Sequence, residues 1–159
     1  MSPDLSLTVQ YATPAPELPR WRLRRWVLQA VQGMARAEGP GANALRTVAL
    51  TLRLVDADEG RRLNREFRSK DYATNVLTFE YGVDPDGTAS GDVVLCVPVL
   101  HREAADQGKP VLDHAAHLTV HGVLHALGYD HIETDEARAM EALEVRILGK
   151  MGIADPYQA

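Results

Sequence analysis

Two histidines four residues apart stand at the start of the segment HGVLHALGYDH, residues 121 to 131. On an α-helix, His121 and His125 would lie on one face about one turn apart, so both imidazoles could reach the same metal ion. We expect Gly128 to end this helix, because glycine readily takes the left-handed conformation of many helix ends. His131 then follows the turn as a third nitrogen ligand. Three protein ligands, with a fourth position left for water, are typical of a catalytic zinc site.

The upstream histidines offer a different set of ligands. His117, His121 and His125 would form a single stripe along the helix. However, His117 and His125 are eight residues apart, a rise of about 12 Å, which is too far for one ion. We therefore predict that the ligands are His121, His125 and His131, with His117 behind them or facing a substrate and His114 an ordinary helix residue. Zinc suits three imidazoles, and nickel or copper is also chemically acceptable.

The spacing HxxxHxxGxxH is also found in the metzincin proteases, whose motif is HExxHxxGxxH. In those enzymes the glutamate after the first histidine is the general base. Gly122 occupies that position here, and a glycine cannot accept a proton. The sequence therefore disfavours a protease, although a zinc hydrolase of another kind stays open as an alternative.

The same segment resembles the signature of the YbeY family of bacterial endoribonucleases that mature ribosomal RNA. Two further blocks agree with this resemblance, NREFRSKDYATNVLTFE at 64–80 and GDVVLC at 91–96. The resemblance implies a single-strand-specific, metal-dependent endoribonuclease with one zinc ion per chain. It also implies maturation of the 3′ end of 16S ribosomal RNA, ribosome quality control, and the small ribosomal subunit as a partner.

Arg68 is the residue that the resemblance implies for catalysis, because it matches an arginine of the family block at 64–80. Cleavage of a phosphodiester places negative charge on the non-bridging oxygens, and a fixed guanidinium suits that charge. No carboxylate stands out as a general base, so water and the RNA 2′-hydroxyl both remain possible nucleophiles. Asn75, Asp92 and Asp130 could orient a histidine or contact RNA, or could simply be turn residues.

Composition and charge bound the remaining possibilities. The 159 residues suffice for one domain, and we expect residues 1–159 to form it. The net charge of −5 hides an uneven distribution: residues 20–70 carry 12 Lys and Arg against 5 Asp and Glu, and residues 103–159 carry 4 against 10. The basic part could hold phosphates or be a solvated face. A single cysteine excludes an internal disulfide, and the lack of a signal peptide or long apolar stretch predicts a cytoplasmic protein.

Apolar periodicity predicts an α+β fold in which a four-stranded sheet packs with about five helices. We expect the metal site at the end of a central helix, and the resemblance implies a mixed sheet in which one strand is antiparallel. A fold of this kind also allows a non-catalytic ribosome assembly factor, in which the metal only fastens the helix end to the turn. The expected strands are 5–11, 47–55, 75–81 and 91–97, the expected helices are 21–37, 57–68, 98–107, 111–127 and 135–149, and VDPDGTASG at 83–91 is expected to be a loop.

Overall fold

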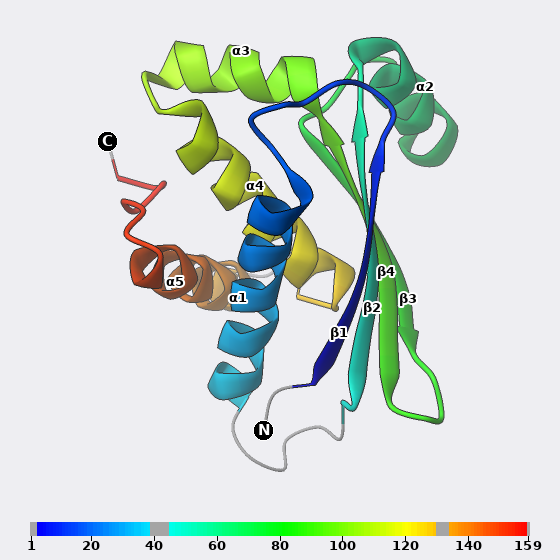
Figure 1. Ribbon diagram of the computed structural model, residues 1–159, viewed down its shortest axis with the longest axis vertical. Coiled ribbons are helices and arrows are strands. Elements are labelled where there is room, and N and C mark those ends of the chain that lie inside the picture. Colours follow the sequence, from blue (N-terminus) through cyan, green and yellow to red (C-terminus); the bar gives the residue numbers. More distant parts are fainter. Residues whose placement is uncertain (1–2, 39–44, 130–133, 159) are drawn as a thin grey trace.

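The computed structural model describes residues 3–38, 45–129 and 134–158. Four strands form one sheet in the order β1-β2-β4-β3, and α1, α4 and α5 lie on one face of it (Figure 1). The predicted α+β class, with a four-stranded mixed sheet and five helices, is confirmed. The elements are β1 (Asp4–Tyr11), α1 (Arg20–Glu38), β2 (Thr47–Val55), α2 (Ala57–Arg68), β3 (Val76–Val83), β4 (Thr88–Cys96), α3 (Val97–Gln107), α4 (Val111–Ala126) and α5 (Thr134–Lys150).

The sheet has three parallel strands and one antiparallel edge. β1 pairs in parallel with β2, β2 pairs in parallel with β4, and β3 pairs with β4 in the antiparallel direction. Side chains alternate between the two faces of a strand, and in β2 this places Val48, Leu50 and Leu52 in the core under the helices. The mixed sheet that the resemblance implied is therefore present.

Strands β3 and β4 extend into the segment 83–91, which was expected to be a loop. They form a hairpin whose turn is closed by two backbone hydrogen bonds, from Asp84 N–H to the carbonyl of Thr88 at 2.9 Å and from Gly87 N–H to the carbonyl of Asp84 at 3.0 Å. Gly87 has φ +82°, a left-handed conformation that suits glycine. The expectation of a loop was wrong for Val83 and for residues 88–91, which belong to the two strands. Pairing between the strands holds residues of weak strand propensity, such as Ala89 and Ser90, in the sheet.

Helix α4 is the central helix of the molecule. It contacts α1, α3, α5, β3 and β4, which is why its apolar residues surround the helix instead of forming one stripe. Strand β4 is likewise central in the sheet, since it lies between β2 and β3. The buried residues of α4 are His114, Ala115, Ala116, Leu118, Thr119, Val120, Gly122, Val123, Leu124 and Ala126.

The second face of the sheet is covered only in part. A small cluster of Val55, Leu77, Val94, Cys96 and Val99 is buried at one end of the strands. In Figure 1, α2 lies beside that end of the sheet, away from α1, α4 and α5. Within the described part of the chain, no helix is both long enough and apolar enough to cross a lipid bilayer.

Candidate metal centre

The last turns of α4 bring two of the predicted metal ligands together. The ring centroids of His121 and His125 are 4.5 Å apart. Immediately beyond them the helix ends as predicted: Gly128 has φ +104° and its N–H donates to the carbonyl of His125 at 3.0 Å, while the N–H of Tyr129 donates to the carbonyl of Leu124 at 3.0 Å. These two bonds form a Schellman motif, in which glycine takes the left-handed position. The third predicted ligand, His131, lies outside the described residues.

Glu144 of α5 supports His121 from behind. Its side chain has no exposed surface, and its Oε1 is hydrogen bonded to Nδ1 of His121. When Nδ1 carries the proton and donates it to the carboxylate, Nε2 holds the lone pair with which an imidazole binds a metal. A carboxylate in this position is the usual partner of a metal-binding histidine, because it fixes both the tautomer and the ring orientation.

His117 and Tyr157 complete the surroundings of the buried carboxylate. Nε2 of His117 is 3.6 Å from Oε2 of Glu144, and the hydroxyl of Tyr157 donates to the same oxygen. Burial raises the pKa of Glu144, but its contacts with His117, His121 and Tyr157 outweigh burial and bring the pKa down to about 2. Burial, with Glu144 adding to it, raises the pKa of Tyr157 well above its usual value. The pair therefore consists of a carboxylate and a protonated phenol.

His117, His121 and Glu144 form a second possible ligand set, since their ligand atoms lie within 4.8 Å of one another. For Glu144 to bind an ion beside His121, however, the proton that Nδ1 shares with it would have to leave. The pair of His121 and His125 needs no such loss, and it keeps Glu144 in the supporting position. Nδ1 of His117 is buried and has no hydrogen-bond partner among the described residues. Its Nε2 lies 3.2 Å from the hydroxyl of Tyr157, so His117 lies with Tyr157 and Glu144 beside the histidine pair, and its role stays a prediction.

Gly122 explains why a protease base is missing. A Cβ atom at this position would lie 2.7 Å from Cγ1 of Val93 and 3.1 Å from Cγ2 of Val76. The position therefore faces the sheet at a point where α4 and the strands are in close contact. A glutamate there would point into the packed interface, where it could not serve the histidine site.

Arg68 shares a pocket with the two histidines. The pocket has a volume of about 300 Å³ and is lined by Arg68, Asn75, Val76, Leu77, Thr78, His121 and His125. The guanidinium of Arg68 donates to the carbonyls of Thr78 at 2.6 Å and Phe67 at 3.1 Å, and lies 5.1 Å from the centroid of the Phe79 ring. Two of its five N–H groups are thus used to fix its position. The others provide donors for an anion in the pocket.

The connection between α2 and β3 holds Arg68 at the edge of the pocket. Helix α2 ends at Arg68 because Ser69 takes a left-handed conformation with φ +58°. Arg61 and Asp71 form an ion pair at 2.7 Å that fastens the following loop to the helix. Asn64, which is buried, donates to the carbonyl of Tyr72 at 2.8 Å. The arginine is therefore presented by a braced turn.

Asn75 is held by two residues that the sequence did not associate with the site. Its Nδ2 donates to Glu103 at 3.0 Å, and the same carboxylate is 2.9 Å from Nε2 of the buried His114. His114 is therefore more than an ordinary helix residue, because it joins α4 to α3 and, through Glu103, to the pocket. Asp92, expected at a strand start, lies inside β4 and accepts a hydrogen bond from the hydroxyl of Tyr81 at 2.7 Å. Asp130 lies outside the described residues.

Sequence reasoning missed Glu144, Tyr157 and Glu103. A signal for Glu144 exists: it lies four residues after Met140 and three before Ile147, both buried positions of α5. A carboxylate on the apolar stripe of a helix requires a buried partner. Nothing in the tail sequence indicated Tyr157, because its partner is reached only through the tertiary fold.

Comparison with known proteins agrees with this geometry. The sequence profile of the YbeY family, described as endoribonuclease YbeY, matches residues 9–152. The chain is 65% identical to the endoribonuclease YbeY of Bordetella pertussis over 159 residues, covering 100% of this chain and 99% of the relative. It is 49% identical to the endoribonuclease YbeY of Paraburkholderia phymatum, covering 99% and 98%. The solution structure of TM1509 from Thermotoga maritima shares the fold, with a TM-score of 0.56, 20% identity, and coverage of 96% and 99%.

Proposed function

Because the chain belongs to the endoribonuclease YbeY family, we propose that it is a metal-dependent endoribonuclease that cleaves single-stranded ribosomal RNA. The observation that carries the proposal is the shared pocket, which both Arg68 and the two histidines of α4 line. A pocket lined by imidazole ligands and a guanidinium suits a phosphodiester, whose oxygens a metal ion and an arginine can bind together.

The described residues fit a divalent transition metal. His121 and His125 supply neighbouring imidazoles, and Glu144 supports the first of them through Nδ1. His131 is proposed as the third ligand, and zinc as the ion, with nickel as an alternative. Such an ion would supply polarisation of a phosphoryl oxygen and would lower the pKa of a bound water.

Arg68 is proposed as the catalytic residue that stabilises the transition state. Its guanidinium is already held by the carbonyls of Phe67 and Thr78, so little reorganisation is needed when charge develops on the phosphate. The described residues that line the pocket include no carboxylate. The nucleophile is either water or the RNA 2′-hydroxyl. In both cases the proposal requires that its proton is accepted by a group other than a carboxylate among these lining residues.

The same proposal includes the biological context. We propose that the protein matures the 3′ end of 16S ribosomal RNA and takes part in ribosome quality control, in contact with the small ribosomal subunit and in the cytoplasm. We also propose that residues 1–159 form one domain. The protease alternative is disfavoured by the close packing at Gly122. The assembly-factor alternative differs from the proposal in one respect, since it requires no cleavage by the metal-loaded protein.

Cleavage of single-stranded RNA before and after metal removal tests the proposal. A nuclease-free preparation should cleave the RNA, lose the activity on treatment with a chelator, and regain it when zinc or nickel is added. Arg68→Glu should abolish cleavage, while Arg62→Glu, a matched charge reversal at an exposed position of α2, should retain it. Metal-loaded protein that leaves RNA intact would refute the nuclease, and chelator-sensitive digestion of casein would favour the protease.

A further inference from the structure

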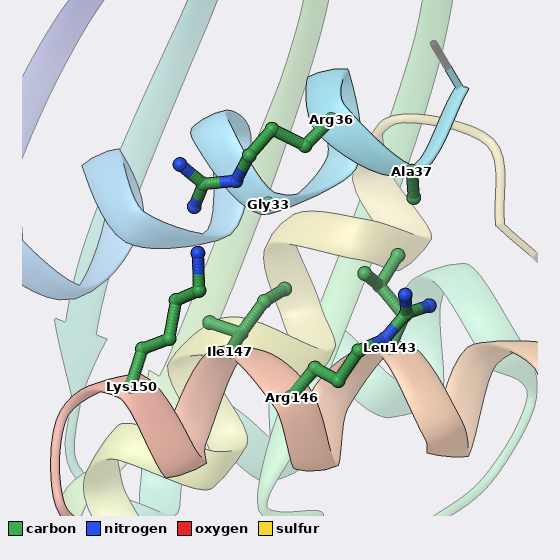
Figure 2. Close-up of a pocket in the computed structure, with 7 residues that line it drawn as sticks. All are labelled: Gly33, Arg36, Ala37, Leu143, Arg146, Ile147 and Lys150. Atoms are coloured by element: carbon green, nitrogen blue, oxygen red, sulfur yellow. The ribbon is translucent and has the colours of Figure 1, made fainter.

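A second pocket lies between α1 and α5 and is surrounded by positive charge. Its volume is about 190 Å³, and it is lined by Gly33, Arg36, Ala37, Leu143, Arg146, Ile147 and Lys150. Figure 2 shows Arg36 reaching from α1 and Arg146 and Lys150 reaching from α5. In this view the head groups of Arg36 and Lys150 point toward one another. This pocket shares no lining residue with the one that holds His121, His125 and Arg68.

The floor of the pocket is apolar and rigid. Leu143 and Ile147 are buried, and a Cβ atom on Gly33 would lie 2.5 Å from Cγ1 of Ile147. The two helices therefore approach each other closely at the glycine, and the longer side chains stand at the rim. The base of the hollow is therefore apolar, and its charged groups lie at the rim.

The three cations are not neutralised by the protein. Within the described residues, neither Arg36 nor Arg146 nor Lys150 takes part in any ion pair. Arg146 and Lys150 are four residues apart on α5, a spacing at which like charges weaken a helix. Arg36 and Lys150 lie in the last turns of their helices, where the helix dipole favours a cation. The dipole accounts for Arg36 and Lys150 separately, but not for the way their head groups point toward one another (Figure 2).

The charge pattern of the sequence makes this convergence unexpected. Residues 103–159 carry only 4 Lys and Arg against 10 Asp and Glu, and two of those four cations, Arg146 and Lys150, line this pocket. Lys150 points toward Arg36, which belongs to the basic part of the chain (Figure 2). In a protein with a net charge of −5, such a concentration of positive charge favours an anion at this place.

We infer that the pocket between α1 and α5 binds a phosphate group of the RNA chain, outside the site of cleavage. Its 190 Å³ is below the range of about 300–1,000 Å³ for pockets that enclose a whole small ligand. It therefore fits a single group presented by a larger molecule better than a free nucleotide. Glu144, in the metal centre, and Lys150 lie six residues apart on α5, which places them about 120° apart around the helix axis. The RNA would thus be held at a point away from the metal centre. The inference rests on the proposed RNA function.

The test measures binding of a labelled, mixed-sequence single-stranded RNA by fluorescence anisotropy at several salt concentrations. The full-length chain is compared with the double variant Arg36→Gln, Lys150→Gln. A second double variant, Arg102→Gln, Arg138→Gln, removes the same charge from exposed positions outside the pocket. Thermal melting of each protein establishes that it is folded.

We expect the Arg36, Lys150 variant to raise the Kd by about two- to tenfold, the range expected for one or two exposed charge pairs. The slope of log Kd against log salt should decrease by about 0.7, corresponding to one phosphate of a single strand. The Arg102, Arg138 control should bind as the unaltered chain does. Cleavage at saturating RNA should stay unchanged in both, because neither variant alters a residue of the metal centre.

Equal Kd and slope in the two double variants would overturn the inference, while binding and cleavage by the unaltered chain would leave the proposed function intact. Failure of the unaltered chain to bind RNA would overturn both together. Inorganic phosphate and a nucleoside monophosphate serve as further probes. If either raises the Tm of the unaltered chain but not of the Arg36, Lys150 variant, and RNA binding is equal in all variants, the pocket binds a free anion and its assignment to RNA is wrong.

Discussion

Replacing Gly122 by alanine tests the close packing that separates this site from a protease. The added Cβ would meet Cγ1 of Val93 at 2.7 Å and Cγ2 of Val76 at 3.1 Å. Val93 is 1% exposed and belongs to the main core, so it has little room to move. Gly149, on α5, is the matched control: it is exposed, and a Cβ there would have no neighbour within 4 Å.

The two substitutions should change stability in opposite directions. Alanine improves helix propensity over glycine by about 0.8–1.0 kcal/mol, and in Gly149→Ala this gain is unopposed, although the position near the helix end reduces it to about 0.5 kcal/mol. At Gly122, overpacking of the core costs about 1–3 kcal/mol, which outweighs the propensity. We expect Gly122→Ala to lose about 1 kcal/mol overall, or about 2–4 °C in Tm for a chain of this size.

Thermal and urea denaturation of both variants beside the unaltered chain give the result directly. Gly122→Ala should lower the urea midpoint without changing the m-value, and Gly149→Ala should raise it slightly. Equal stabilisation by both substitutions would refute the reasoning, because it would mean that Gly122 has room for a side chain. In that case the absence of a base at this position would need another explanation.

Three further predictions concern the supporting residues. Glu144→Gln should weaken zinc affinity by about 10–100-fold, the usual effect of losing a carboxylate behind a ligand histidine, while Glu141→Gln, at an exposed position, should leave it unchanged. Competition with a chelating dye measures both affinities. Equal affinities would show that Glu144 does not support His121 as a ligand. Ser69→Gly should stabilise the protein by up to about 1 kcal/mol, since φ +58° favours glycine; a loss of stability in urea would show that Ser69 makes a compensating contact. His114→Ala should cost about 1–3 kcal/mol by leaving Glu103 without its buried partner, and an unchanged unfolding midpoint would argue against that network.

Local patterns allowed most of the fold to be predicted. The positions of α4, of its two histidines and of the glycine that ends it depend on contacts within a few residues, and all follow from the sequence. The hairpin at 83–91 did not follow, because pairing with a neighbouring strand decided it.

The residues that support the site could not be predicted in the same way. Glu144 is 23 residues from His121, and Tyr157 lies 40 residues from His117. Their meeting depends on how α5 and the tail pack against α4, which periodicity does not specify.

Metal content and RNA cleavage measured on the same sample test the central claim most directly, with His125→Ala and Arg68→Glu beside the unaltered chain. The account predicts that His125→Ala loses both metal and cleavage, and that Arg68→Glu keeps the metal and loses cleavage. The ion and the guanidinium would then have separate roles in one pocket. If all three preparations cleave RNA equally, the pocket is not the site of cleavage and the account is wrong.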